Sequence, residues 1–129
     1  MSSLRILQKN MYRFYFEKMD VWQNTCDLVE KVYLVSMKFP KSEKYNFTDQ
    51  SRRSVISIMT NLAEGSSRST KKDQAHFTSM AFSSLMELLS LVIITDRMNL
   101  IDEGTYSQLR ERIAFIGNQL NALRKAQLK

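Results

Sequence analysis

Residues 74–95 read QAHFTSMAFSSLMELLSLVIIT and carry one charged side chain, Glu87. Their second half, Leu88-Leu89-Ser90-Leu91-Val92-Ile93-Ile94, is apolar on every side when it is wound as a helix. A surface helix needs only one apolar stripe, so a helix of this kind must be covered on all sides. A chain of 129 residues has few other helices to supply that cover. We therefore expect a helical bundle in which other subunits also contact this helix.

The same window is too polar for a membrane-spanning segment. Its polar residues are Gln74, His76, Thr78, Ser79, Ser83, Ser84, Glu87, Ser90 and Thr95. The first residues of the chain lack the continuous apolar stretch of a signal peptide. Cys26 is the only cysteine and cannot form an internal disulfide, which suits a reducing compartment. We therefore expect a cytoplasmic protein with no membrane partner.

Three glycines and one proline are very few for a chain of this length, and this scarcity favours long helices with short connections. The spacing of apolar residues predicts helices over 20–38, 48–64 and 70–98 and from 102 onward. Helices of similar length joined by short turns pack against each other in antiparallel pairs. We predict one all-α domain over 19–129, an antiparallel up-down-up-down four-helix bundle, preceded by an arm or tail over 1–18.

Polar residues mark the expected helix ends. The predicted N-caps are Asp20, Thr48, Thr70 and Asp102. Asp73 lies three residues after Thr70, as in a capping box. Pro40 stops the first helix, and Gly65 fits the left-handed position that follows the second.

The segment before the bundle is rich in aromatic residues. Tyr12, Phe14 and Phe16 alternate with Arg13 and Tyr15, which fits a short extended arm. A tail that takes no part in the fold fits equally well. The four aromatic rings could stack on nucleic-acid bases. We expect them instead to pack on a neighbouring subunit or on the end of the bundle.

Four motifs occur along the chain in a recognisable order. They are Phe16-Glu-Lys-Met-Asp-Val-Trp22, Lys38-Phe-Pro-Lys-Ser-Glu43, Ser51-Arg-Arg-Ser-Val55 and Asn61-Leu-Ala-Glu-Gly65. Together they resemble the bacterial four-helix-bundle family named after proteins encoded in intervening sequences of 23S ribosomal RNA genes, over residues 14–127. The resemblance implies a ring of subunits, typically a pentamer. A related branch serves diversity-generating retroelements, where a basic ring binds nucleic acid and reverse transcriptase. Met59 stands where members often have proline, so we expect a straighter second helix here.

The expected subunit interface is the apolar half of the third helix. Its residues are Leu88, Leu89, Leu91, Val92, Ile93 and Ile94. Both the all-round apolar pattern and the resemblance to ring-forming proteins indicate a homo-oligomer.

The formal net charge is +6, and the whole excess lies in residues 1–72. Bundle topology places Arg13, Lys18 and the 65–72 turn at one end, and Lys38, Lys41 and Lys44 at the other. The expected nucleic-acid contacts are Arg52, Arg53, Arg68, Lys71 and Lys72. The last three lie beside the start of a helix, whose free amides favour phosphate. A solvated loop in which lysines only maintain solubility is the alternative, and the resemblance favours binding.

Catalytic and metal-binding patterns are weak. Arg53, Asn61 and Glu64 lie near one face of the second helix, and we interpret them as a structural polar network. His76 is the only histidine and Cys26 falls on an apolar face, so we expect no metal and no cofactor. Nucleophile elbows and phosphate loops are absent from the sequence. We expect a non-enzymatic oligomer that binds RNA or DNA backbone through a basic ring surface; the alternative is a protein-protein interaction scaffold.

Overall fold

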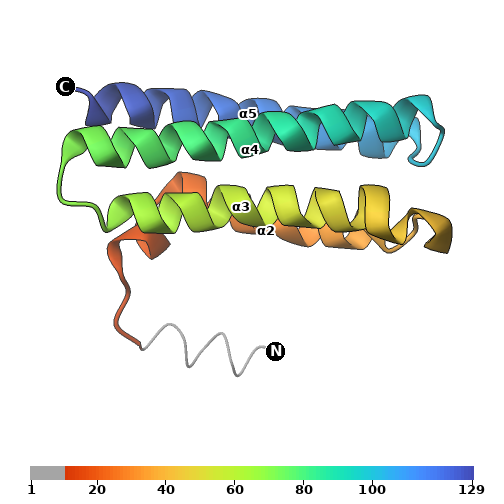
Figure 1. Cartoon of the computed structure of the whole chain (residues 1–129), viewed down its shortest axis with the longest axis horizontal. Coiled ribbons are helices and arrows are strands. Elements are labelled where there is room, and N and C mark those ends of the chain that lie inside the picture. Colours follow the sequence, from red (N-terminus) through yellow and green to blue (C-terminus); the bar gives the residue numbers. More distant parts are fainter. Residues whose placement is uncertain (1–10) are drawn as a thin grey trace.

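The computed structural model describes residues 11–129 as an all-α bundle of four long helices. These are α2 (Asp20–Ser36), α3 (Asp49–Ser66), α4 (Lys71–Arg97) and α5 (Glu103–Gln127). Successive helices run in opposite directions and are joined at alternating ends (Figure 1). Each helix contacts the next, and α5 also contacts α2, which closes the bundle. The predicted up-down-up-down architecture is confirmed.

Three short helical segments flank α2. A 3-10 turn, η1 (Tyr15–Lys18), precedes α2 and contacts both α2 and α3. A second 3-10 turn, η2 (Lys41–Glu43), and a π-helical turn, η3 (Lys44–Thr48), connect α2 to α3. The expected arm over 1–18 is therefore described from residue 11 onward, and residues 1–10 lie outside the described part.

The core is a set of aliphatic side chains that recur every three or four residues on α3, α4 and α5, and on α2 the buried Thr25 fills the position between Val21 and Leu28. It comprises Val21, Leu28, Val32, Val55, Ile58, Leu62, Ala81, Leu85, Leu88, Val92, Leu109, Ile113, Ile116 and Leu120. This alternation of three- and four-residue steps keeps one stripe of each helix facing its neighbours, as in coiled-coil packing. Burial of these stripes is the main force that holds the four helices together.

The bundle itself covers one side of the apolar half of α4. Leu88 and Val92 are buried in the subunit's own core, so their prediction as interface residues is wrong. Leu91 is half-buried and lines a small apolar space to which α2, α3, α4 and α5 all contribute. Leu89 and Ile93 are half-buried and Ile94 is exposed on the outer side of the helix. An apolar sequence with no polar stripe cannot reveal which side faces inward.

Within the described residues, α4 is long and apolar enough to cross a membrane when judged by length and composition alone, so the sequence argument that this window is too polar to span a membrane is wrong as a composition argument. Core helices of soluble proteins share that property, and its inner face carries Ala81, Leu85 and Leu88 of the bundle core.

Two predicted N-caps are confirmed by hydrogen bonds. Thr70 Oγ1 accepts from the backbone N–H of Asp73 at 3.1 Å, and Asp102 Oδ1 accepts from Thr105 at 2.7 Å. The bond from the Thr105 backbone lowers the pKa of the Asp102 carboxyl below its usual value. The distances agree with ordinary capping geometry.

Two other predicted caps are wrong. Thr48 already has helical backbone angles and makes no capping bond, because η3 runs directly into α3. Asp20 is the first residue of α2, and Met19 occupies the cap position before it. An acidic side chain in the first turn still interacts favourably with the positive end of the helix dipole.

Gly65 does not adopt the predicted left-handed conformation, since no glycine in the described residues has a positive φ. It is a buried residue inside α3, which continues to Ser66. A Cβ atom at Gly65 would lie 2.8 Å from Cβ of Phe77 on α4, closer than side chains normally approach. Gly65 therefore allows α3 and α4 to pack closely beside the turn that joins them. The left-handed residue is Asn99, with φ 59°, in the turn after α4.

Candidate nucleic-acid interface

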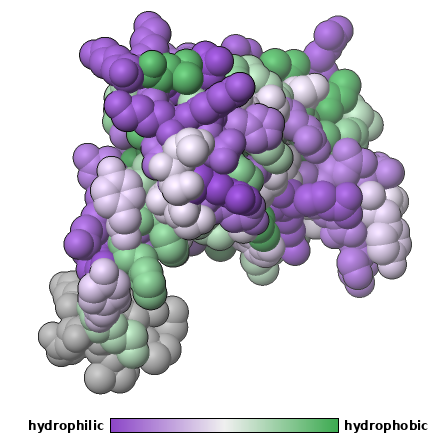
Figure 2. Space-filling view, turned by 60° about the vertical axis from the view of Figure 1, so that its left-hand side comes forward, coloured by the Kyte–Doolittle hydropathy of each residue, from purple (hydrophilic) through white to green (hydrophobic). Residues whose placement is uncertain are grey.

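Three separate segments meet at one end of the bundle: residues 11–20, 64–76 and 121–129 (Figure 1). They contain eight basic and four acidic side chains. The basic ones are Arg13, Lys18, Arg68, Lys71, Lys72, Arg124, Lys125 and Lys129. We call this surface the basic end. Hydrophilic residues cover most of it in the space-filling view (Figure 2).

The opposite end is close to electrical balance. Residues 36–53 and 94–106 meet there and contain six basic and five acidic side chains. Lys38, Lys41 and Lys44 are among them, as the topology predicted. The positive excess of the bundle is therefore concentrated at the basic end, where a phosphate backbone would be attracted.

Arg124, Lys125 and Lys129 are members of the basic end that the sequence analysis did not assign. They lie at the end of α5, which runs antiparallel to α4 and so finishes beside its start. The Nε of Arg124 donates to Ser79 Oγ on α4 at 2.8 Å, which joins the two helices. Their position follows from the antiparallel order, and the balanced charge of residues 73–129 concealed it.

Arg68 is held in a defined position on the turn between α3 and α4. Its guanidinium carbon lies 4.5 Å from the centroid of the Phe77 ring, in a cation–π contact. Its backbone oxygen accepts from Nε2 of Gln74 at 2.9 Å. Arg68 is exposed as a whole, and its guanidinium N–H groups can donate to a ligand.

Lys71 and Lys72 are both exposed in the first turn of α4. Lys71 also lines a cavity of about 420 Å³ together with Tyr15 before α2, Gln74 on α4 and Gln127 on α5. We call it the end cavity. Its volume lies in the range of cavities that hold small ligands.

Side chains, rather than helix dipoles, determine the sign of the field at this end. The starts of α2 and α4 lie there with the ends of α3 and α5, so positive and negative helix ends alternate. One of the backbone N–H groups at the start of α4, that of Asp73, already donates to the hydroxyl of Thr70. The predicted contribution of the helix start to phosphate binding is therefore smaller than expected.

Arg52 and Arg53 do not join the other three predicted contacts. They lie in the first turns of α3, about 20 Å along the helix from its other end. The Nε of Arg52 donates to Ser36 Oγ at 2.8 Å, and its guanidinium stacks 4.5 Å from the Tyr33 ring. Arg52 thus connects α3 to α2, while Arg53 is exposed.

The polar network that was predicted from Arg53, Asn61 and Glu64 contains Asn61 but otherwise consists of other residues. The Asn61 amide donates to the Ser57 backbone oxygen at 2.9 Å and to its hydroxyl at 3.2 Å. The Ser57 hydroxyl lies 2.9 Å from the Ser84 hydroxyl of α4. Arg53 and Glu64 are exposed, and these hydrogen bonds of Asn61 and Ser57 do not involve them. Ser84 is the partner that the sequence did not reveal.

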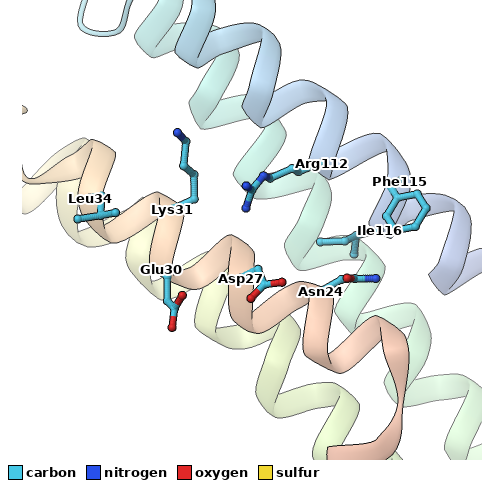
Figure 3. A pocket seen from close by; sticks show the side chains of 8 residues that line it. All are labelled: Asn24, Asp27, Glu30, Lys31, Leu34, Arg112, Phe115 and Ile116. Carbon is cyan, nitrogen blue, oxygen red and sulfur yellow. The ribbon is translucent and has the colours of Figure 1, made fainter. Parts of the chain in front are cut away.

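A second groove lies between α2 and α5 and has a volume of about 350 Å³ (Figure 3). Asp27, Glu30 and Leu34 line it from α2, and Arg112 and Phe115 line it from α5. Lys31 and Arg112 balance the two carboxylates, so the groove has no excess of positive charge that would favour phosphate. Two exposed apolar side chains among mixed charges are more typical of a contact between proteins.

Residues with metal-binding or nucleophilic side chains are dispersed. His76 is exposed, and its ring contacts that of Phe77 edge-on. The sulfur of Cys26 lies 3.7 Å from that of Met59 on α3, and burial raises the pKa of the Cys26 thiol to about 11. Within residues 11–129 no group of three His, Cys, Asp or Glu residues could hold a metal ion.

Comparison with known proteins agrees with the architecture. The chain is similar to the crystal structure of a protein of unknown function from the S23 ribosomal protein family of Bacteroides thetaiotaomicron, with a TM-score of 0.74 and 19% identity. The similarity covers 81% of this chain and 98% of that one, and at this identity it shows the fold. No curated protein matches. A sequence profile of the 23S rRNA-intervening sequence protein family matches residues 17–122, and the chain therefore belongs to that family.

Proposed function

We propose that this protein is a non-enzymatic homo-oligomer that binds the phosphate backbone of RNA or DNA through the basic end. One observation carries the proposal: this end carries eight basic and four acidic side chains, whereas the other end carries six basic and five acidic ones. Arg68 offers a planar donor fork to phosphate oxygens, while Lys71 and Lys72 act as point charges. Contacts of this kind carry no base information, so binding should tolerate changes of sequence.

Self-association would multiply this charge. On the outer side of α4, Met86, Leu89, Ile93 and Ile94 surround a shallow apolar depression of about 370 Å³. Apolar side chains in such a cluster gain free energy when a second surface covers them. Together with the resemblance to ring-forming relatives, this supports a pentamer in which the basic ends repeat around one axis.

The proposal is tested by titrating fluorescent single-stranded RNA and DNA with the protein at low and then at rising salt. Wild-type protein should bind both, and its affinity should fall steeply as salt increases. The Lys71→Glu/Lys72→Glu variant should bind at least about tenfold more weakly. The matched control is Lys41→Glu/Lys44→Glu at the opposite end, which should retain wild-type affinity.

Two results would contradict the proposal. One is the absence of wild-type binding even at low salt. The other is an equal loss of affinity in both charge-reversal variants, because net charge rather than the basic end would then explain the binding.

A protein-binding scaffold is the second candidate, and the groove between α2 and α5 supports it. Leu34 and Phe115 are both exposed there, beside Asp27, Glu30 and Arg112. A partner that covers them would gain apolar burial inside a polar rim. If this is the function, a Leu34→Asp/Phe115→Asp variant should lose the protein contact, and light scattering should then give a smaller mass for its assembly than for the wild-type assembly. Wild-type protein should also bind no oligonucleotide.

A further inference from the structure

The arm before α2 exposes three aromatic side chains to solvent. Tyr12, Phe14 and Tyr15 are 80%, 60% and 70% exposed. Phe16, in contrast, packs edge-on against Trp22 with 5.0 Å between ring centroids. Of the two predicted kinds of packing, on a neighbouring subunit or on the end of the bundle, Phe16 makes the second. The rings of Tyr12, Phe14 and Tyr15 stay exposed on the single subunit, where another molecule can contact them.

Hydrogen bonds to Glu17 hold the exposed part of the arm in place. Its carboxylate accepts from the backbone N–H of Phe14 at 2.8 Å. Its backbone oxygen accepts from Arg13 at 2.8 Å and from Gln23 of α2 at 2.7 Å. The Tyr12 and Phe14 rings also contact each other edge-on at 5.1 Å. An ordered arm can present its rings to a ligand with little loss of conformational entropy.

Basic side chains accompany these rings. Arg13 lies between Tyr12 and Phe14 in the sequence, and Lys18 ends the following turn. Tyr15 lines the end cavity together with Lys71, so one aromatic residue and one basic residue border the same space. Residues 11–14 also extend away from the four long helices (Figure 1).

We propose that the basic end binds single-stranded RNA or DNA, with unpaired bases stacked on Tyr12, Phe14 and Tyr15. The phosphates between these bases then pair with Arg13, Lys18 and Lys71. Alternating aromatic and basic groups are how proteins bind single strands without reading their sequence. A duplex offers phosphates but keeps its base faces stacked inside the helix, so the rings gain nothing from it. This inference rests on the proposed function and narrows it to strands with free bases.

The test compares three fluorescent probes of equal length: a uniform-sequence single strand, the same strand without bases, and a duplex. Wild-type protein should bind the base-bearing strand at least about 100-fold more tightly than the abasic strand, since each of the three stacked bases contributes about 1 kcal/mol or more. The Tyr12→Ala/Tyr15→Ala variant should lose most of this preference while keeping its affinity for the abasic strand. Tyr12→Phe/Tyr15→Phe should restore the preference, because the phenyl ring still stacks.

Tyr45 provides a matched control, since it is 78% exposed at the opposite end of the bundle. Tyr45→Ala should behave as wild type with all three probes. Equal wild-type affinity for base-bearing and abasic strands overturns the single-strand inference and leaves backbone binding intact. Failure to bind any probe at low salt overturns the proposed function as well. A change in oligomeric mass in Tyr12→Ala/Tyr15→Ala, with unchanged base preference, identifies the arm as a subunit contact and also overturns the inference.

Discussion

Replacing Gly65 by alanine tests how α3 and α4 pack beside the basic end. In an open helix this substitution stabilises a protein by about 1 kcal/mol, because alanine has the higher helix propensity. Here the new Cβ would lie 2.8 Å from Cβ of Phe77. That atom is fixed to the backbone of α4 and cannot swing aside, so the two helices must move apart.

The magnitude follows from two opposing terms. Overpacking of a tight contact costs about 1–3 kcal/mol, and the gain in propensity offsets about 1 kcal/mol of it. Gly65→Ala should therefore lower the free energy of unfolding by about 1 kcal/mol. Gly117→Ala is the matched control, because its Cβ would meet Leu85 at 3.5 Å and Phe82 at 3.7 Å, which are ordinary contacts. It should raise the free energy of unfolding by about 0.5–1 kcal/mol.

The assay is urea unfolding followed by far-ultraviolet circular dichroism. All variants are compared at one subunit concentration, because self-association contributes to apparent stability. The two alanine variants should differ by about 2 kcal/mol, which corresponds to a difference of about 8 °C in Tm. A third variant, Gly65→Asn, should be less stable than Gly65→Ala, because its side chain is larger.

The reasoning is refuted if Gly65→Ala is as stable as Gly117→Ala. It is also refuted if Gly65→Asn is more stable than Gly65→Ala. Asparagine tolerates the left-handed conformation better than alanine, so that order would place Gly65 in a helix-ending position after all.

Three further predictions concern other parts of the bundle. Leu88→Ala should reduce the free energy of unfolding by about 2–5 kcal/mol, whereas Ile94→Asp should chiefly reduce oligomeric mass in light scattering; the reverse pattern would contradict the assigned sides of α4. The raised pKa of Cys26 keeps its thiol protonated at pH 8, so a disulfide reagent should react slowly with folded protein and rapidly in urea, and equal rates would contradict this. Because the pKa of Asp102 is lower in the folded state than in the unfolded state, its carboxylate stabilises the fold at pH values above the unfolded pKa. The difference in free energy of unfolding between wild type and Asp102→Ala should therefore persist at neutral pH and shrink as the pH falls through the folded pKa. A difference that stays constant down to low pH would contradict this.

Features of the fold that depend on local sequence were predictable. Thr70 and Asp102 act as caps because their side chains reach an amide only three residues away. Thr48 and Gly65 could not be assigned in the same way. The π-helical turn before α3 places Thr48 inside a continuous helical segment. Gly65 is needed because α3 packs closely against Phe77 of α4, and the residues next to Gly65 in the sequence do not show this contact.

The sequence predicted at which end of the bundle the candidate site lies, but it predicted only some of the residues that form the site. Antiparallel order is enough to bring Lys18, Arg68 and Lys71 to one end of the bundle. It cannot show that Arg52 contacts Ser36 and Tyr33, since this depends on the rotation of α3 against α2. The inner side of α4 was also hidden, because an apolar helix without a polar stripe has no preferred orientation in its sequence.

The salt dependence of binding, measured side by side for wild type and Lys71→Gln/Lys72→Gln, tests most directly whether the basic end pairs with phosphates. Each phosphate contact on a single strand contributes about −0.7 to the slope of log affinity against log salt. The variant should therefore give a slope that is shallower by about 1.4 for each subunit that engages the strand. Equal slopes, with affinity changed or unchanged, would contradict the account, because the two lysines would then release no counterions when nucleic acid binds.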